Sequence, residues 1–289
     1  MGQANLSAAT GCSQLAPEAD GEKGDSLSDT KSAASKQDCS MPFKAFIDRA
    51  GELAAQRLAL LRGMETTLRA TFGKAARLAQ LTSVDGRLIV AIDGIMPVDE
   101  VDEFFRCLQG DAFRCTEFAR PDTREFRHHV TEYNVPRFRQ TPIFAAINEA
   151  TQLFFPPRDA DSRLEVYRAY TNAVLYGDVG FVHQDSNNDD HVTALLYPNP
   201  EWSSELGGET VFYAADGEIA AAIEPRPGRL VLFHGIIPHK GSPPSRLFFG
   251  TRYTTAFKFA PQNECDEQTD MRPRLASPAG DSSDAPQPE

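Results

Sequence analysis

The chain has 289 residues, of which 41 are acidic and 29 are Lys or Arg, so its net charge at neutral pH is −12. This length fits one domain of about 200 to 250 residues with tails. The acidic balance and the lack of a basic stripe argue against nucleic acid as a substrate, because a phosphate backbone is bound by cationic side chains. No segment reaches the ~18 consecutive apolar residues of a membrane span.

Both ends of the chain differ in composition from the middle. Residues 1–41 are rich in Ser, Ala, Gly, Asp and Lys, and residues 261–289 are rich in Pro, Ser, Asp and Glu. Neither segment can bury enough apolar surface to offset the entropy of ordering, so we predict a disordered tail at each end. The two tails together carry eight of the twelve net negative charges.

Cysteine usage and the N-terminus bear on the compartment. The chain has five cysteines without metal-ligand spacing, and its first residues contain no apolar signal core. Both features favour a reducing compartment over a disulfide-forming one. We therefore expect an intracellular protein, cytoplasmic in the first instance, with the nucleus as an alternative. The residues leave the oligomeric state open.

The predicted elements begin with a long helix. Between Pro42 and Thr71, apolar residues recur at three- and four-residue steps, which predicts an amphipathic helix packed as a brace on a sheet, or alternatively a dimerisation helix. Arg87–Asp93 is typical of a buried strand, and helices are expected over Val98–Leu108 and Thr141–Phe155. From Leu164 onward, short runs rich in Val, Tyr, Phe and Thr alternate with turn residues, as in a sandwich or jelly roll.

A short motif in this β-rich part carries the chemistry. His183 and Asp185 are two residues apart, so in extended backbone their side chains project to the same side and can bind one ion together. His239 follows 54 residues after Asp185. Two imidazoles and one carboxylate are the facial triad of non-haem Fe(II) oxygenases, which leaves positions open for a co-substrate and O₂.

The segments around the motif occur in a fixed order. They are Arg168–Asn172, Leu175–Gly177, His183–Asp185, Leu196–Trp202, Gly207–Thr210, Pro227–Phe233 and Pro238–Lys240. In this order the chain resembles the prolyl 4-hydroxylase-like branch of the Fe(II)/2-oxoglutarate-dependent dioxygenases, over roughly residues 85–260. The resemblance implies an α+β fold with a mainly β core, a double-stranded β-helix (jelly roll) braced by N-terminal helices.

The domain organisation implied is one dioxygenase domain over residues 42–260 between the two tails. Helical support is expected over residues 42–160, and the jelly-roll core over about 85–95 and 164–260. The loops Phe118–Arg139 and Ser186–His191 are expected to lie over the mouth of the barrel.

The resemblance also assigns roles to residues. His183, Asp185 and His239 are the expected iron ligands, with His239 preferred over His234 because its Pro-His-x-x-x-Pro context matches the distal ligand. Arg252, in Gly-Thr-Arg-Tyr, is the expected anchor for the remote carboxylate of 2-oxoglutarate, because a guanidinium matches a carboxylate with two parallel hydrogen bonds. Arg246 is the alternative anchor.

Two tyrosines, Tyr176 and Tyr197, are expected to complete the co-substrate site. Gly207–Thr210 is interpreted as structural, and Trp202 as packing at the strand-to-loop junction.

The activity implied is hydroxylation of a C–H bond coupled to conversion of 2-oxoglutarate and O₂ to succinate and CO₂, with ascorbate as a supporting reductant. The carboxylate at position 185 favours hydroxylation, since related halogenases have a small residue there. The expected substrate is a prolyl residue in a protein or peptide. The alternatives are a free amino acid or other small metabolite on the same scaffold, and a jelly-roll binding module without catalysis.

Overall fold

The structure is a computed structural model that describes residues 43–157, 163–262 and 264. The chain divides into two compact units, Met1–Ala50 and Gly51–Glu289. Of the first unit only the opening turns of the first helix are described, and the account below concerns the second. The predicted tail 1–41 lies outside the described residues, as does most of 261–289, so both tails remain predictions.

Four α-helices occur in the described residues, and they confirm the three helices predicted from the sequence. They are α1 (Phe43–Phe72), α2 (Val98–Gly110), α3 (Val135–Phe138) and α4 (Pro142–Phe154). The start of α4 follows from its sequence, because Thr141 Oγ1 accepts a hydrogen bond from the Phe144 N–H and Pro142 occupies the first turn. No helix among the described residues combines the length and the apolar character needed to cross a membrane.

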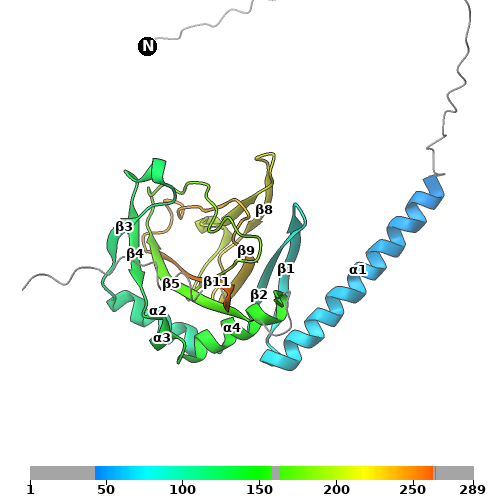
Figure 1. The fold of residues 1–289 in the computed structure, drawn as a ribbon, viewed down its shortest axis with the longest axis horizontal. Helices are drawn as coiled ribbons and strands as arrows, with labels where there is room; N and C mark the ends of the chain where they lie inside the picture. The colour runs from blue at the N-terminus through cyan, green and yellow to red at the C-terminus, as the bar shows by residue number, and fades with distance from the viewer. Residues whose placement is uncertain (1–42, 158–162, 263, 265–289) are drawn as a thin grey trace, which may run out of the picture. The chain divides into compact units, whose positions relative to one another are not determined.

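The strands form two antiparallel sheets (Figure 1). The larger sheet has the order β1-β2-β9-β6-β11-β5-β4-β3, and the smaller has the order β10-β7-β8. The strands are β1 (Arg77–Val84), β2 (Arg87–Asp93), β3 (Arg114–Glu117), β4 (His128–Glu132), β5 (Leu164–Val174), β6 (Val192–Tyr197), β7 (Thr210–Tyr213), β8 (Ile219–Ile223), β9 (Arg229–His234), β10 (His239–Gly241) and β11 (Arg252–Pro261).

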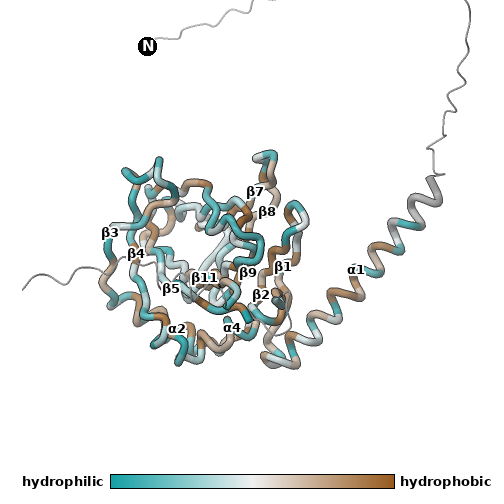
Figure 2. Tube along the Cα trace, in the orientation of Figure 1, coloured by the Kyte–Doolittle hydropathy of each residue, from teal (hydrophilic) through white to brown (hydrophobic). Residues whose placement is uncertain are grey.

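The central strands are buried on both faces, which explains their nearly continuous apolar runs. In β9, Leu230 and Leu232 belong to a core cluster shared with the helices, whereas Val231 and Phe233 belong to a second cluster shared with the smaller sheet. The period of two along a strand sends alternate residues to the two clusters. Figure 2 shows the hydrophobic residues along β1 and β2. This arrangement confirms the predicted mainly β, jelly-roll fold class with supporting helices.

The helix α1 does not brace the sheet along its length. Leu53, Leu58 and Leu60 are exposed, and the first buried residue of the helix among those described is Leu68, in the cluster with the other helices. The brace prediction is therefore wrong for the turns that contain Leu53, Leu58 and Leu60. Periodicity alone predicts an apolar face and does not say what covers it.

The region 42–160, expected to be helical support, contains three strands in addition to β2. Of these, β1 forms a hairpin with β2 through Asp85 and Gly86, whose φ angles of 50° and 78° suit a tight hairpin turn. β3 and β4 add to the edge of the larger sheet, where β4 pairs with β5. β4 also lies within the predicted loop Phe118–Arg139. Its sequence, His-His-Val-Thr-Glu, has one buried residue, so its apolar pattern is too weak to predict a strand.

Candidate metal centre

His183, Asp185 and His239 come together although they lie on separate segments. The first two follow β5, and His239 begins β10. The backbone N–H of His183 donates to the His239 carbonyl and the reverse bond also forms, both at 2.9 Å, which fixes the two segments to each other. One ligand atom from each of the three side chains lies within 4.8 Å of the others.

Both histidines are oriented for metal binding. His183 Nδ1 lies 3.0 Å from the Phe181 carbonyl oxygen, and His239 Nδ1 lies 2.8 Å from that of Ile237. Because a carbonyl oxygen only accepts, each Nδ1 carries the proton and each Nε2 presents a lone pair. Burial lowers the pKa of His239, which favours the neutral imidazole that a metal requires.

Asp185 is buried and ionised. Burial alone would raise the pKa of its carboxyl, but the charge of Lys258 holds this pKa well below its usual range. Its Oδ1 lies 3.5 Å from His183 Nε2, and its Oδ2 lies 3.4 Å from His239 Nε2. The three side chains therefore offer two imidazole nitrogens and one carboxylate, close enough together to bind one ion.

The other histidines make different contacts. His234 Nδ1 lies 2.8 Å from the Asp189 carbonyl oxygen, and its ring packs on Phe155. His191 is buried, with Nδ1 2.8 Å from Ser186 Oγ and Nε2 2.8 Å from Glu264. His129 is exposed. Among the described residues, the metal-ligating cluster contains none of these.

A cavity extends from the three side chains to Arg252, which is only 2 % exposed. Arg252 Nε donates to the Gly208 carbonyl at 2.7 Å, and Nη1 donates to Thr254 Oγ1 at 2.6 Å. Nη2 is buried and has no hydrogen-bond partner among the described residues. Burial lowers the pKa of Arg252, yet a guanidinium stays charged in proteins. The part of the chain that the structure describes supplies no ion-pair partner for this cation, so the cavity suits an anion.

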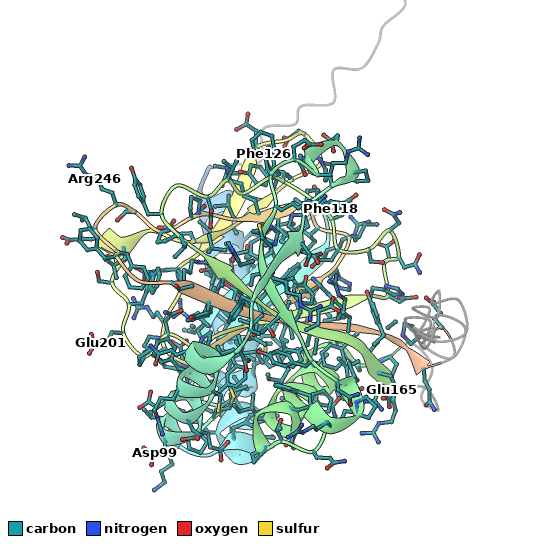
Figure 3. All side chains as sticks on the ribbon, turned by 90° about the vertical axis from the view of Figure 1, so that its left-hand side faces the viewer. Asp99, Phe118, Phe126, Glu165, Glu201 and Arg246 are labelled. Carbon is teal, nitrogen blue, oxygen red and sulfur yellow. The ribbon has the colours of Figure 1, made fainter. Side chains whose placement is uncertain are left out.

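Arg246, the alternative anchor, is exposed, and Figure 3 shows it at the periphery of the molecule. It is not among the residues that line the cavity. The motif Gly207–Thr210 explains part of the placement of Arg252. Gly208 has a φ of +80°, and a Cβ there would lie 2.9 Å from Arg252 Cδ and from Trp202 Cζ2. Trp202 in turn donates from Nε1 to the Gly207 carbonyl at 2.9 Å. Gly208 therefore makes room for the arginine.

Residues 171–259 match the family described as the 2OG-Fe(II) oxygenase superfamily. The matched segment contains His183, Asp185, His239 and Arg252, and it is similar to this superfamily. Its members are oxygenases that use Fe(II) and 2-oxoglutarate, and the cluster of two histidines and an aspartate fits that metal by its donor set. No curated protein matches the chain.

Several solved structures are similar to the chain. A prolyl 4-hydroxylase from Pseudomonas putida is 23% identical, with 57% of this chain and 88% of that chain covered and a TM-score of 0.40. A prolyl hydroxylase from Trichoplax adhaerens, in complex with a hypoxia-inducible factor peptide fragment, is 17% identical, with 73% and 96% covered and a TM-score of 0.48. HygX from Streptomyces hygroscopicus, with nickel and 2-oxoglutarate bound, is 17% identical, with 69% and 87% covered and a TM-score of 0.44.

The two predicted tyrosines occupy different positions in the structure. The Tyr197 hydroxyl lies 2.6 Å from the hydroxyl of Thr210, which lines the cavity, and the Arg252 guanidinium lies 5.6 Å from the centre of the Tyr197 ring. Tyr197 is therefore buried behind the cavity wall and contacts two residues that line it, whereas Tyr176 is 62% exposed; neither tyrosine is itself among the lining residues. The structure therefore does not bring Tyr176 to the site, because it lies in the loop after β5 rather than on the strand.

Two residues that the sequence interpretation missed face the same cavity. Tyr170 lies on β5 and Lys258 on β11, and both are buried. Tyr170 could have been found from the sequence, because Tyr170, Asn172 and Val174 alternate along one strand and all three line the cavity. No local signal marks Lys258.

Proposed function

We propose that this protein is a dioxygenase that hydroxylates a prolyl residue in a protein or peptide. The observation that carries the proposal is the pairing, within one cavity, of the cluster His183, Asp185 and His239 with a buried arginine that lacks an anionic partner among the described residues. A metal site at one end and a fixed cation at the other suit a dicarboxylate with a chelating end and a remote carboxylate.

The residues then have distinct tasks. His183, Asp185 and His239 would hold Fe(II), which when bound supplies the activation of O₂ coupled to conversion of 2-oxoglutarate to succinate and CO₂. Arg252 binds the remote carboxylate through Nη2, while its Nε and Nη1 bonds to Gly208 and Thr254 keep the guanidinium plane fixed. Tyr197 orients Thr210 toward the cavity through their hydroxyl contact.

Support for a prolyl substrate comes from the sequence pattern around the site and from the mouth of the cavity. Tyr197, Trp202 and Arg252 fall in the order typical of prolyl hydroxylases. Phe126, which lines the cavity, is 56% exposed, and its ring centroid lies 5.2 Å from that of Phe181. Exposed aromatic rings of this kind pack against pyrrolidine rings and extended peptide. Figure 3 labels Phe126 and Phe118, the second of which is also exposed.

The test is an incubation of the protein with Fe(II), ascorbate, 2-oxoglutarate and a library of proline-containing peptides. Succinate formation and the gain of one oxygen atom on a prolyl residue, both measured by mass spectrometry, are the expected results. His183→Ala abolishes succinate formation, whereas His129→Ala, at an exposed histidine, retains it.

Arg252→Met raises the KM for 2-oxoglutarate by about tenfold or more, because a charged hydrogen bond contributes roughly 1.5–3 kcal/mol. Arg246→Met, at the exposed alternative anchor, leaves this KM unchanged.

Two results would count against the proposal in different ways. Turnover of free proline or another metabolite, with no oxidised peptide, would contradict the peptide substrate and favour the small-molecule alternative. Absence of succinate under all conditions would contradict the dioxygenase assignment and leave the binding module.

A further inference from the structure

Lys258 is a buried cation beside the metal ligands. It is 6% exposed and lines the cavity from β11, on the same face as Arg252, Thr254 and Ala256. One strand therefore carries an arginine at the far end of the cavity and a lysine at the metal end. A lysine is almost never fully buried unless it is paired. The group that pairs with Lys258 therefore indicates what the lysine does.

The partner is the carboxylate of Asp185. Lys258 Nζ forms an ion pair with Asp185 Oδ2, and both side chains are almost inaccessible to water. Thr193 Oγ1 donates to the same oxygen at 2.7 Å, and Lys258 Nζ also lies 3.3 Å from Thr193 Oγ1. His239 Nε2, at 3.4 Å from Oδ2, carries no proton because Nδ1 bonds to a carbonyl, so it does not compete for this oxygen.

The two donors use the lone pairs of one oxygen only. A carboxylate oxygen has about two lone-pair sites, and on Oδ2 both are engaged by Lys258 and Thr193. The nearest ligating atom to Oδ1 is His183 Nε2, at 3.5 Å. The free lone pairs of the Asp185 carboxylate are therefore those of Oδ1.

We propose that Lys258, together with Thr193, is a positioning residue that holds Asp185 as a one-oxygen ligand through Oδ1. A carboxylate free to turn can bind a cation through both oxygens and so takes two coordination positions. The chelating end of 2-oxoglutarate and O₂ need the positions opposite the triad, so occupation of one of them by Oδ2 weakens co-substrate binding. The inference rests on the proposed function and specifies what keeps its metal site open.

Because Lys258 is positively charged, a positioning role can be told apart from a direct contribution to metal affinity. A buried ammonium next to a dication is repulsive, so its removal does not weaken metal binding through charge. Its removal also leaves the Asp185 carboxylate without its ion pair, which a metal then compensates. A positioning role therefore predicts metal affinity that is retained or increased, together with a changed coordination number and weaker 2-oxoglutarate binding.

The experiment uses the full chain loaded with Co(II), whose visible absorption reports coordination number and which does not turn over. Lys258→Met is expected to bind Co(II) at least as tightly as the wild type, to show an altered Co(II) spectrum, and to bind 2-oxoglutarate about tenfold or more weakly by calorimetry, in the range seen when groups that orient metal ligands are removed. Lys258→Arg, which keeps a charged donor, is expected to restore part of the affinity. Lys74→Met, at an exposed lysine, is the matched control.

An unchanged Co(II) spectrum and unchanged 2-oxoglutarate affinity in Lys258→Met would overturn the inference, as would loss of Co(II) binding with an unaltered spectrum of the residual complex. If circular dichroism shows that Lys258→Met does not fold, Thr193→Val decides, because it removes the other donor to Oδ2 and keeps the lysine; no spectral change in that variant overturns the inference. Failure of the dioxygenase assignment is distinguishable, because wild-type Co(II) protein would then bind no 2-oxoglutarate, whereas the Co(II) spectra of wild type and Lys258→Met would still report the coordination of Asp185. Failure of the peptide substrate alone would leave 2-oxoglutarate binding by the wild type intact.

Discussion

At the scale of single residues, a glycine and an arginine depend on each other. Gly208 supplies the carbonyl that accepts from Arg252 Nε, and its missing side chain leaves the space through which the arginine passes. The motif that marks the family in the sequence is thus part of the anion end of the cavity. An L-residue at this φ of +80° is also strained, so space and backbone conformation both require glycine.

Gly208→Ala is expected to weaken 2-oxoglutarate binding, because its Cβ would lie 2.9 Å from Arg252 Cδ and displace the guanidinium. Gly217→Ala is the matched control, with a similar φ of +86° and no atom within 4 Å of its Cβ. Both variants lose stability by about 1 kcal/mol from the backbone conformation. Calorimetry should show reduced affinity in the first variant alone, and equal affinities in the two would contradict this account of the motif.

At the scale of elements, a buried ion pair joins β2 to β9. Asp93, the last residue of β2, accepts from Arg229 Nε at 2.7 Å and from Nη2 at 3.0 Å, and Arg77 of β1 adds a third bond at 2.8 Å. Burial alone would raise the pKa of the Asp93 carboxyl, but the hydrogen bonds and charges of Arg229 and Arg77 lower it. These contacts hold three neighbouring strands in register at one edge of the sheet.

Asp93→Asn is expected to lower the free energy of unfolding by about 3 kcal/mol, since it leaves the buried Arg229 without a counter-charge. Glu65→Gln, which breaks the exposed pair with Arg69, should change it by less than about 0.5 kcal/mol. Urea denaturation measures both.

The pH dependence of this contribution has a defined sign. Because the folded pKa of Asp93 is depressed, its contribution is fully present above the unfolded pKa of about 3.9 and is lost as the pH falls through the folded pKa. The stability difference between wild type and Asp93→Asn should therefore shrink below about pH 4. A difference that stays constant in this range would show that the carboxylate charge is not its source.

At the scale of the whole described domain, the metal site depends on the tertiary fold. Its ligands come from the segment after β5 and from the start of β10, and a pair of backbone hydrogen bonds joins them across 56 residues of sequence. In the unfolded chain these groups are far apart, so a metal binds the folded state alone.

Mn(II) or Co(II) is therefore expected to raise the melting temperature, by an amount equivalent to about 2.7 kcal/mol when the free metal is at a hundredfold excess over its Kd. The variant that carries both His183→Ala and Asp185→Ala should show no such shift. Thermal scans with and without metal check this, and an equal shift in that variant would place the stabilising metal elsewhere.

Features that depend on local pattern could be predicted from the amino-acid sequence. The spacing of His183 and Asp185, the context of Arg252 and the apolar run of β2 each lie within a few residues. The helices α2 and α4 followed from periodicity and from Pro at their starts. Such signals can be interpreted without a fold because backbone geometry converts short spacing directly into direction.

Only the folded molecule shows which side chains face the cavity, because they come from strands that are distant in sequence. The fold places Tyr170 inside and Tyr176 at the surface, although both are tyrosines on one side of the same motif. It also brings Lys258 to Asp185 and adds the polar segment His128–Glu132 as a strand beside β5. The physical reason is that pairing between strands and burial of a charge depend on partners dozens of residues away, which no local spacing encodes.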